Sequence, residues 1–597
     1  MSSSEEDSRS KAASAARKRR KRQYDLVEEE EKEEAPKGPR RSRPIVLDDS
    51  LIQDSLDREE SHDDQGNTMD SSAPSFLAND EGTEGHSPIS LHVDDNTIRI
   101  MVSTDNHLGY CERDPIRGMD SFAALEEVLY LAKHYQVDMV LLGGDLFHDN
   151  KPSRQTLHTT MDILRRYTMG PNPIQIQIIS SPEATPFRSG QRDLVNYEDE
   201  HYSVDLPIFA IHGNHDDPTR EGGAQGELLS AMDFLDVANL VNYFGRQDQV
   251  NSVEISPILI QKGDTKLSLY GLGHMRDERL NRMWESKNVR FLRPQERRAG
   301  SDFDSSNKTA LQSFNLFVIH QNRENGRGTK NCIKESMIPE WMDFVIFGHE
   351  HECQIEPQES VVGTFRVSQP GSSVAISLSA SEAVMKQVGI LDICGDHFRM
   401  MPIPLTQVRT LLMRDISLSA NNTYPKLDPD DPKVDEKVAK MLHEQVQVMI
   451  HDANEEMAER LELAHQKGNV LASQLLIQRN GASDSNNGDA DRNGDFPLRH
   501  RLQQPEQSLI RLRVEYSGFT VLNNQRFGVC PLSSFLFYFC SYTYRDCLFS
   551  SWICLSVYVL LALALSVAGQ VCWQSCQSNR NSSFSSKEGR NWGSRGR

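Results

Sequence analysis

Side chains of the kinds that bind divalent metal ions occur in five short motifs along the chain. In GNHDDP, Asn214 and His215 follow directly on the apolar run LPIFAIH. The other four motifs are D-x-H with Asp105 and His107, GDLFH with Asp145 and His148, VIH with His320, and GHEH with His349 and His351. Gly, Asn, Asp and Pro are also turn formers, and a single histidine at a strand end more often packs or caps than binds a metal. Turn chemistry does not predict five repetitions, so the motifs together indicate a metal site.

The spacing within the motifs has a mechanical reason. Alternate residues of an extended strand share a face, so D-x-H and H-x-H each direct two side chains the same way. A carboxylate can bridge two cations, whereas an imidazole or an amide oxygen fills a single position, and mixed nitrogen and oxygen ligands favour Mn, Fe or Zn over Mg or Ca. Two such ions can activate a water and bind the oxygens of a phosphoester during an in-line displacement. The motifs therefore predict a two-metal phosphoesterase.

Each motif ends an apolar segment that predicts a buried strand. These segments are TIRIMVSTD, VDMVLLGGD, LPIFAIHGN, NLFVIH and MDFVIFGHEH. Two other runs, DSFAALEEVLYLAKHYQ and RQTLHTTMDILRRYTM, have helical periodicity. Strands that alternate with helices predict an α/β core. The motifs would then lie at the carboxyl ends of the strands, where open α/β sheets keep their active sites.

Composition divides the 597-residue chain into four segments. Residues 1–95 are highly charged and poor in aromatic residues, which predicts a disordered tail. Its basic run RKRRKR is either a solvated charge block or a nuclear import or nucleic-acid contact. Residues 96–404 would form the α/β core. Residues 405–528 predict a smaller α+β domain, with 468–500 as an insertion, and residues 529–597 form an atypical tail.

Charge and cysteine usage exclude some classes of protein. The formal net charge of -21 argues against a uniformly basic, DNA-coating surface, although a local basic groove is compatible with it. The four cysteines before residue 528 show no CxxC pairing, which suits a reducing compartment. The opening MSSSEEDSRS has no apolar core, so we expect no secretory signal.

The order of the motifs resembles that of the calcineurin-like metallophosphoesterases. Longer segments, namely TDNHLGY, GGDLFHDNKPSR, IHGNHDDP, VIHQNR, FGHEHEC and QPGSSVA, resemble the eukaryotic meiotic-recombination-eleven nucleases of the MRN/MRX double-strand-break repair complex. The resemblance runs from about Thr97 to Gly528. It implies an αββα sandwich that carries two metals, with a smaller α+β capping domain that helps to select DNA.

The resemblance also implies a role for each motif residue. One Mn²⁺ ion would be bound by Asp105, His107, Asp145 and His351, and a second by Asp145, Asn214, His320 and His349. Asp145 would bridge the two ions. His215 would act on the leaving oxygen or the transition state, and His148 would contact the phosphate. The implied reactions are 3′-to-5′ exonuclease and single-strand endonuclease cleavage of DNA, in a nuclear enzyme of double-strand-break repair and meiotic recombination.

The partners implied by the resemblance are DNA, a second copy of the chain, a coiled-coil ABC ATPase and a nibrin-like subunit. The homodimer would form through the region RGMDSFAALEEVL and the helix from Arg154, and the nibrin-like subunit would contact residues 180–199. Arg276, Arg279 and Arg323 lie near the motifs and would either contact phosphate or form surface pairs.

Two other functions stay open at this point. A phosphoprotein or nucleotide phosphatase could use the same core, but GDLFHDN lacks the arginine of the phosphatase motif GDxVDRG. A non-catalytic scaffold is disfavoured because the set of motif ligands is complete.

The chain departs from the family pattern after Gly528. The uncharged segment Cys547–Gly569 has 23 residues, which is long enough for a transmembrane helix. However, the codons of VCWQSCQ, residues 571–577, can be read in a shifted frame as the family's continuation YVGKVAN. We therefore interpret residues 529 to about 569 as a retained intron followed by an out-of-frame tail, in preference to a membrane anchor. The ATPase-docking segment would then be missing from this chain.

Overall fold

The computed structural model describes most of the chain between residues 89 and 519, together with two short pieces of the tail. The described residues are 89–91, 93–180, 194–220, 228–247, 249, 251–297, 308–310, 312–323, 331–419, 427–479, 507–519, 537–539 and 552–559. All of them belong to one unit, Ile45–Arg597. The tail predicted for residues 1–95, with its basic run, lies outside the described residues except for its last few positions.

The first of two large sheets has six strands in the order β19-β18-β1-β2-β4-β7. Its central strands β1, β2, β4 and β7 are parallel neighbours, and β18 runs antiparallel to both β1 and β19. The bounds are β1 Ile98–Ser103, β2 Met139–Gly143, β4 Ile208–Ile211, β7 Asn242–Tyr243, β18 Gln387–Cys394 and β19 His397–Pro404.

The second sheet has seven strands in the order β16-β17-β15-β14-β10-β9-β3. Strands β10, β14, β15 and β17 are parallel neighbours, so their carboxyl ends share one edge. The bounds are β3 Gln177–Ile178, β9 Ile258–Lys262, β10 Thr265–Leu272, β14 Phe314–His320, β15 Phe344–Gly348, β16 Gln354–Glu359 and β17 Arg366–Gln369.

The two sheets pack face to face over an apolar core. Strand β1 shows how the sequence achieves this, because Ile98, Ile100 and Val102 point into the core between the sheets while Met101 points to the outer layer. Facing side chains come from the second sheet, among them Phe314 and Ile346. Both faces of each sheet are thus buried, which explains why the strand segments read as almost uninterrupted apolar runs.

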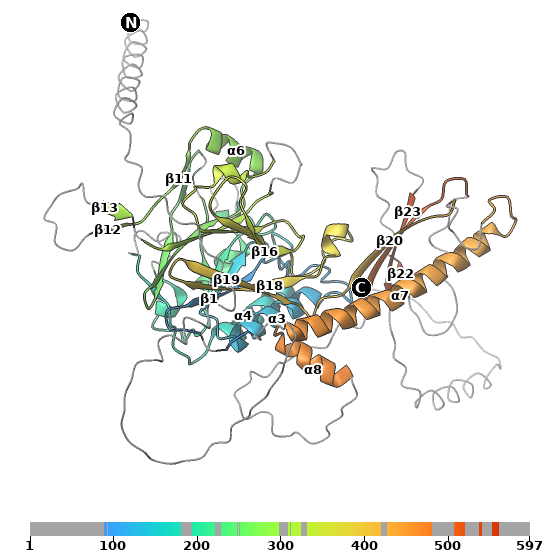
Figure 1. Ribbon diagram of the computed structural model, residues 1–597, viewed down its shortest axis with the longest axis horizontal. Helices are drawn as coiled ribbons and strands as arrows, with labels where there is room; N and C mark the ends of the chain where they lie inside the picture. The colour runs from blue at the N-terminus through green and yellow to red at the C-terminus, as the bar shows by residue number, and fades with distance from the viewer. Residues whose placement is uncertain are drawn as a thin grey trace, which may run out of the picture. The chain divides into compact units, whose positions relative to one another are not determined.

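Helices cover the two outer faces. Figure 1 shows α3 (Asp120–His134) and α4 (Arg154–Thr168) on one side of the sheets and α6 (Asp277–Glu285) on the other. Helix α4 begins where the Ser153 side chain accepts a hydrogen bond from the Thr156 N–H. Helix α5 (Ala231–Val237) begins with a capping box. The predicted αββα sandwich and both predicted helices are confirmed.

Short elements complete the sandwich. Three two-stranded pairs connect β5 with β6, β8 with β11, and β12 with β13. The bounds are β5 Thr219–Arg220, β6 Leu228–Leu229, β8 Val253–Ile255, β11 Val289–Phe291, β12 Gln295–Arg297 and β13 Lys308–Ala310, with 3-10 helices η2 Asn196–Glu198, η3 Glu335–Met337 and η4 Ala380–Glu382.

The smaller α+β part consists of a four-stranded sheet and a long helix. The sheet order is β20-β21-β23-β22, and helix α7 (Val434–Gln466) packs on it through Val438, Leu442 and Ile450. Buried residues of α7 recur every three to four positions, as one face of an amphipathic helix requires. The strand bounds are β20 Leu411–Ser417, β21 Leu509–Glu515, β22 Phe537–Phe539 and β23 Trp552–Val559.

The segment predicted as an insertion, 468–500, begins with a packed helix. Helix α8 (Val470–Arg479) buries Leu471 in the outer core of the sandwich. The rest of that segment, from residue 480, lies outside the described residues.

The tail also contributes structure, because β22 and β23 lie beyond Gly528. Strand β23 pairs antiparallel with β21, from Trp552 opposite Glu515 to Tyr558 opposite Leu509. These residues fall within the segment weighed as a membrane helix, and here they form a strand. Among the helices that the structure describes, none combines the length and apolar character needed to cross a membrane.

A buried carboxylate joins the sandwich to the smaller part. Glu127 of α3 accepts hydrogen bonds from the Thr406 N–H (2.8 Å), the Gln407 N–H (2.8 Å) and the Asn469 side-chain amide (2.8 Å). Burial raises the pKa of Glu127, and these hydrogen bonds act in the opposite direction. One side chain of α3 therefore holds both the end of the first sheet and the start of α8.

We expect Glu127→Ala to lower the free energy of unfolding by about 3 kcal/mol, because several buried donors lose their acceptor. Urea unfolding monitored by circular dichroism measures the change. Glu436→Ala, on the exposed face of α7, is the control and should stay within about 0.5 kcal/mol of the parent. Equal unfolding midpoints for Glu127→Ala and the parent would contradict the role of this carboxylate.

Candidate metal centre

The five motifs meet at the edge where both sheets present the carboxyl ends of parallel strands. Asp105 and His107 follow β1, Asp145 and His148 follow β2, and Asn214 and His215 follow β4. From the second sheet, His320 ends β14, and His349 and His351 follow β15. The structure thus brings all nine predicted residues together, and each sheet contributes part of the site.

Asp105, His107 and His351 form the first group of ligand-type side chains. One ligand atom from each lies within 4.8 Å of the others. The Nε2 atoms of His107 and His351 are 3.3 Å apart, and His351 Nε2 is 3.8 Å from Asp105 Oδ1. Two imidazole nitrogens that face each other at this distance can share a cation.

Asp145, His320 and His349 form the second group, again within 4.8 Å of one another. The Asn214 side-chain oxygen lies 3.3 Å from His320 Nε2 and 2.7 Å from His349 Nδ1. This amide oxygen therefore completes a cluster of two imidazoles and one carboxylate.

Asp145 lies between the two groups. Its Oδ2 atom is 3.2 Å from His320 Nε2 and 3.9 Å from His107 Nε2. Its Oδ1 atom accepts the His215 backbone N–H at 2.7 Å, so the carboxylate cannot turn freely. Oδ2 is buried and accepts no backbone N–H within the described part of the chain, so it faces the two imidazoles, where a cation that both groups could share would lie.

Electrostatics favour positive charge at this place. Burial opposes ionisation of Asp145, but His320 outweighs it and holds the pKa of this carboxyl well below its usual range. Burial likewise opposes protonation of His320, yet Asp145 and Asp105 raise the pKa of its imidazole to about 10. Burial and the neighbouring His320 lower the pKa of His349 to about 3, so that ring is neutral, as a metal ligand must be.

Hydrogen bonds on the far side of two rings fix which nitrogen faces the site. His320 Nδ1 donates to the Gly143 carbonyl at 2.8 Å, which directs Nε2 at Asp145, where a bound cation would take the place of the Nε2 proton. His351 Nδ1 donates to Glu382 Oε1 at 2.9 Å and likewise presents Nε2. Partners of this type orient metal-binding histidines and raise their basicity. The mixed nitrogen and oxygen set therefore fits a divalent transition metal.

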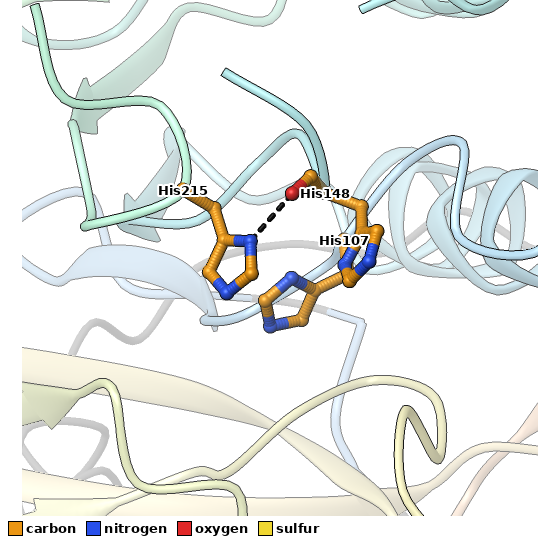
Figure 2. A group of neighbouring side chains, drawn as sticks. All are labelled: His107, His148 and His215. Atoms are coloured by element: carbon orange, nitrogen blue, oxygen red, sulfur yellow. Dashed lines mark hydrogen bonds between the residues drawn. The ribbon is translucent and has the colours of Figure 1, made fainter.

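His148 and His215 lie beside the first group. His215 Nδ1 donates to the His148 carbonyl oxygen at 2.5 Å, as the dashed line in Figure 2 shows. The two rings stack with centroids 5.0 Å apart and planes 25° apart, and the His107 ring meets His215 edge-on at 4.9 Å. The His215 Nε2 is the ring nitrogen that does not donate to His148.

The backbone of the site is strained. Asp105, His107, Asp145 and His349 have φ values of 52°, 49°, 49° and 82°, in the left-handed region that non-glycine residues rarely adopt. Each such residue costs on the order of 1–3 kcal/mol, and strain of this kind clusters at functional sites. The fold therefore holds these four side chains in place against their local preference.

Asp216, which belongs to GNHDDP, supports the site without facing it. Its buried carboxylate accepts N–H bonds from Gly213 (2.5 Å), Leu146 (2.8 Å) and Phe147 (3.3 Å). Burial and the charge of Asp145 raise the pKa of Asp216 to about 7. The residue ties the loop after β2 to the loop after β4. The motif GNHDDP gives no signal for this structural role of its first aspartate.

Two further residues near the site were not predicted. The His274 ring lies 6.4 Å from that of His320 and 6.1 Å from that of His349. Tyr110 packs edge-on against His148, with centroids 4.9 Å apart. Neither residue stands at a predicted strand end, so the motif pattern carried no signal for it.

The three arginines near the motifs have protein contacts. Arg323 bonds to Glu335 at 3.2 Å, and Arg279 donates to the Gln249 carbonyl at 3.1 Å. Arg276 and Arg279 both lower the pKa of Asp217, which burial raises to about 6. Of the two roles predicted for these arginines, pairing with other protein groups therefore applies to Arg323 and Arg279.

Comparison with known proteins gives two family matches. Residues 98–353 match the family described as calcineurin-like phosphoesterase, and residues 398–530 match the family described as Mre11 DNA-binding presumed domain. The first match contains every residue of the two ligand groups, and it implies a divalent metal. The predicted fold class is confirmed.

Relatives of known function that are similar to this chain are named double-strand break repair protein MRE11. The double-strand break repair protein MRE11 of Homo sapiens is 43% identical over 440 residues, which are 73% of this chain and 53% of that protein. MRE11 of Gallus gallus is 44% identical over 371 residues (62% and 50%), and that of Arabidopsis thaliana 40% over 440 residues (72% and 52%). The predicted resemblance is confirmed. The chain spans about half the length of these relatives.

The close packing of Gly213 gives a test of the site. A Cβ atom at Gly213 would lie 2.1 Å from Asp145 Oδ1, so Gly213→Ala must displace the carboxylate between the two groups. We expect Gly213→Ala to weaken Mn²⁺ binding at least about tenfold, as measured by isothermal titration calorimetry.

Gly395→Ala is the matched control for this test. Gly395 has a φ of +61° and no atom within 4 Å of an added Cβ, so the substitution strains the backbone without touching the site. It should cost about 1–2 kcal/mol of stability and leave Mn²⁺ affinity unchanged. Equal Mn²⁺ affinity of Gly213→Ala and the parent would refute the placement of Asp145.

Proposed function

Because the chain joins a calcineurin-like phosphoesterase domain to an Mre11 DNA-binding presumed domain, we propose that it is a Mn²⁺-dependent DNA nuclease that processes ends in double-strand-break repair. The observation that carries the proposal is the pair of ligand groups that share the Asp145 carboxylate. Its reactions would be 3′-to-5′ exonuclease and single-strand endonuclease cleavage. The relatives named as double-strand break repair proteins support this choice among phosphoesterase activities.

In this proposal, seven residues would hold two metal ions. Asp145 would serve both positions, with Asp105, His107 and His351 as the other residues of the first and Asn214, His320 and His349 as those of the second. When bound, a pair of divalent ions supplies positive charge at the phosphoester oxygens and activates a water for in-line attack. Gly143 and Glu382 hold His320 and His351 in the tautomers that such binding requires.

His215 and His148 would act on the substrate. The His215 Nδ1–H is held by the His148 carbonyl, so its Nε2 can hold a proton and give it to the leaving oxygen. The half-buried His148 ring lies flat against that of His215 and would contact the phosphate. Tyr110 packs edge-on against the His148 ring, with centroids 4.9 Å apart.

The wider assignments belong to the same proposal. The segment 405–528 would cap the site and help select DNA, and residues 96–404 would carry the chemistry. The enzyme would act in the nucleus as a homodimer, with a coiled-coil ABC ATPase and a nibrin-like subunit as partners. The MRE11 name of the relatives supports the repair role.

His215→Ala separates chemistry from metal binding. We expect it to lower the single-turnover rate of single-stranded DNA cleavage in Mn²⁺ by about 10²–10⁴-fold, because the proton donor is lost. Calorimetric titration should still show two bound Mn²⁺ ions. The control is His397→Ala, at a residue that lies beside the start of β1 and so at the opposite end of that strand from Asp105, and this variant should cleave like the parent. A His215→Ala variant that cleaves at the parent rate would disprove this role.

The substrate class is tested with the parent protein. Single-stranded DNA, a mononucleotide and a phosphopeptide are offered in parallel with Mn²⁺. Cleavage of the DNA alone supports the nuclease proposal, whereas release of phosphate from the other two substrates without DNA cleavage indicates a phosphatase.

His349→Ala addresses the second ligand group. We expect the variant to bind one Mn²⁺ ion with near-parent affinity and the other at least about tenfold more weakly, because His349 contacts Asn214 and belongs to the Asp145 group alone. Electron paramagnetic resonance of free Mn²⁺ gives both affinities. A titration that matches that of the parent would remove His349 from the ligand set.

A further inference from the structure

Three residues beyond the motif ligands form a buried charged cluster next to His351. Glu382, at the end of η4, and Lys386, just before β18, are 0% and 2% exposed in their side chains. Ser372 stands between them and is also fully buried. Charged side chains are seldom fully buried unless they are paired, so the partners of Glu382 and Lys386 indicate what the cluster does.

Both oxygens of Glu382 are engaged. Oε1 accepts the His351 Nδ1–H at 2.9 Å and the Ile376 N–H at 3.3 Å. Oε2 accepts the Lys386 ammonium at 2.6 Å and the Ser372 hydroxyl at 3.0 Å. A carboxylate with this many partners is fixed in orientation, so the His351 ring that donates a hydrogen bond to it is fixed as well.

Lys386 connects the cluster to the backbone of His351. Its ammonium donates to the His351 carbonyl at 3.1 Å and to Ser372 Oγ at 2.8 Å, in addition to Glu382. All three ammonium hydrogens are thus used. His351 is held at its ring by Glu382 and at its backbone by Lys386.

The QPGSSVA segment extends this arrangement to the other side of the first ligand group. The Ser373 N–H donates to the Asp105 carbonyl at 3.3 Å, and the Ser372 N–H to the His351 carbonyl at 3.3 Å. The Thr104 hydroxyl donates to the Gly371 carbonyl at 3.0 Å. One loop therefore spans the two strands that deliver Asp105 and His351, which come from different sheets.

We propose that Glu382 is a positioning residue that sets the tautomer and orientation of His351 for the first metal ion, and that Lys386 and the Ser372–Ser373 loop hold Glu382 and His351 in register with Asp105. This inference rests on the proposed two-metal function. Its geometry concerns the first group alone, because neither Glu382 nor Lys386 contacts Asn214, His320 or His349 within the described part of the chain.

The test compares Mn²⁺ binding by the full chain and its variants, with electron paramagnetic resonance to count free ion. The parent should bind two ions. Glu382→Ala should weaken one of the two sites about 10–100-fold and leave the other unchanged. Glu382→Gln should show a smaller loss, because its amide oxygen can still accept the His351 N–H while the negative charge is gone.

Asp138→Asn is the matched control. Asp138 is also a buried carboxylate that accepts a hydrogen bond from a lysine, here from Lys262 at 2.8 Å. Asp138 precedes β2 and therefore lies at the opposite end of that strand from Asp145. Asp138→Asn removes the same kind of charge pair and should leave both Mn²⁺ affinities at parent values. A thermal unfolding curve is recorded for each variant.

Each outcome decides between positioning and a general structural role. Selective weakening of one site, graded from Glu382→Gln to Glu382→Ala, supports positioning. Unchanged binding, or an equal loss at both sites together with a lowered unfolding midpoint, overturns it. A parent that binds no Mn²⁺ overturns it too, whereas a parent that binds two ions and cleaves no DNA overturns the proposed nuclease function alone.

Discussion

The whole arrangement depends on keeping one carboxylate, that of Asp145, buried between imidazoles from two sheets. A buried carboxylate is costly unless positive charge and hydrogen-bond donors surround it. Here the His215 N–H fixes one oxygen, and His320 and His107 face the other. The surrounding features follow from that need. Gly213 stands where a side chain would collide with the carboxylate, and Asp145 itself has a left-handed backbone conformation.

Sequence predicted the parts of the site that lie at strand ends. An apolar run marks each strand, and the polar residues after it mark the edge of the sheet, so Asp105, Asp145, Asn214, His320 and His349 could be located before any coordinates. Strands without ligands at their ends, such as β9 and β18, were not singled out because no motif follows them.

Other parts could not be predicted, for physical reasons. Glu382 lies 31 residues after His351 in a segment without a motif, and only the turn of the chain through η4 brings it to the ring. Asp216 stands among ligand-type residues, but its carboxylate turns back to the backbone. The tail is a third case, because an apolar run without periodicity is compatible with either a helix or a strand. Pairing with β21 gives residues 552–559 the strand conformation of β23.

Each ligand group draws on both sheets. The first combines Asp105, which follows β1, with His351, which follows β15, and the second combines Asp145 with His320 and His349. An ion bound to either group would therefore cross-link the two layers at this edge, in addition to hydrogen bonds such as the one from His320 to the Gly143 carbonyl. Binding and folding then become linked equilibria: tighter ion binding raises resistance to unfolding, and any loosening of the layers lowers ion affinity by the same free energy. The free energy of unfolding of the sandwich would then include the free energy of ion binding.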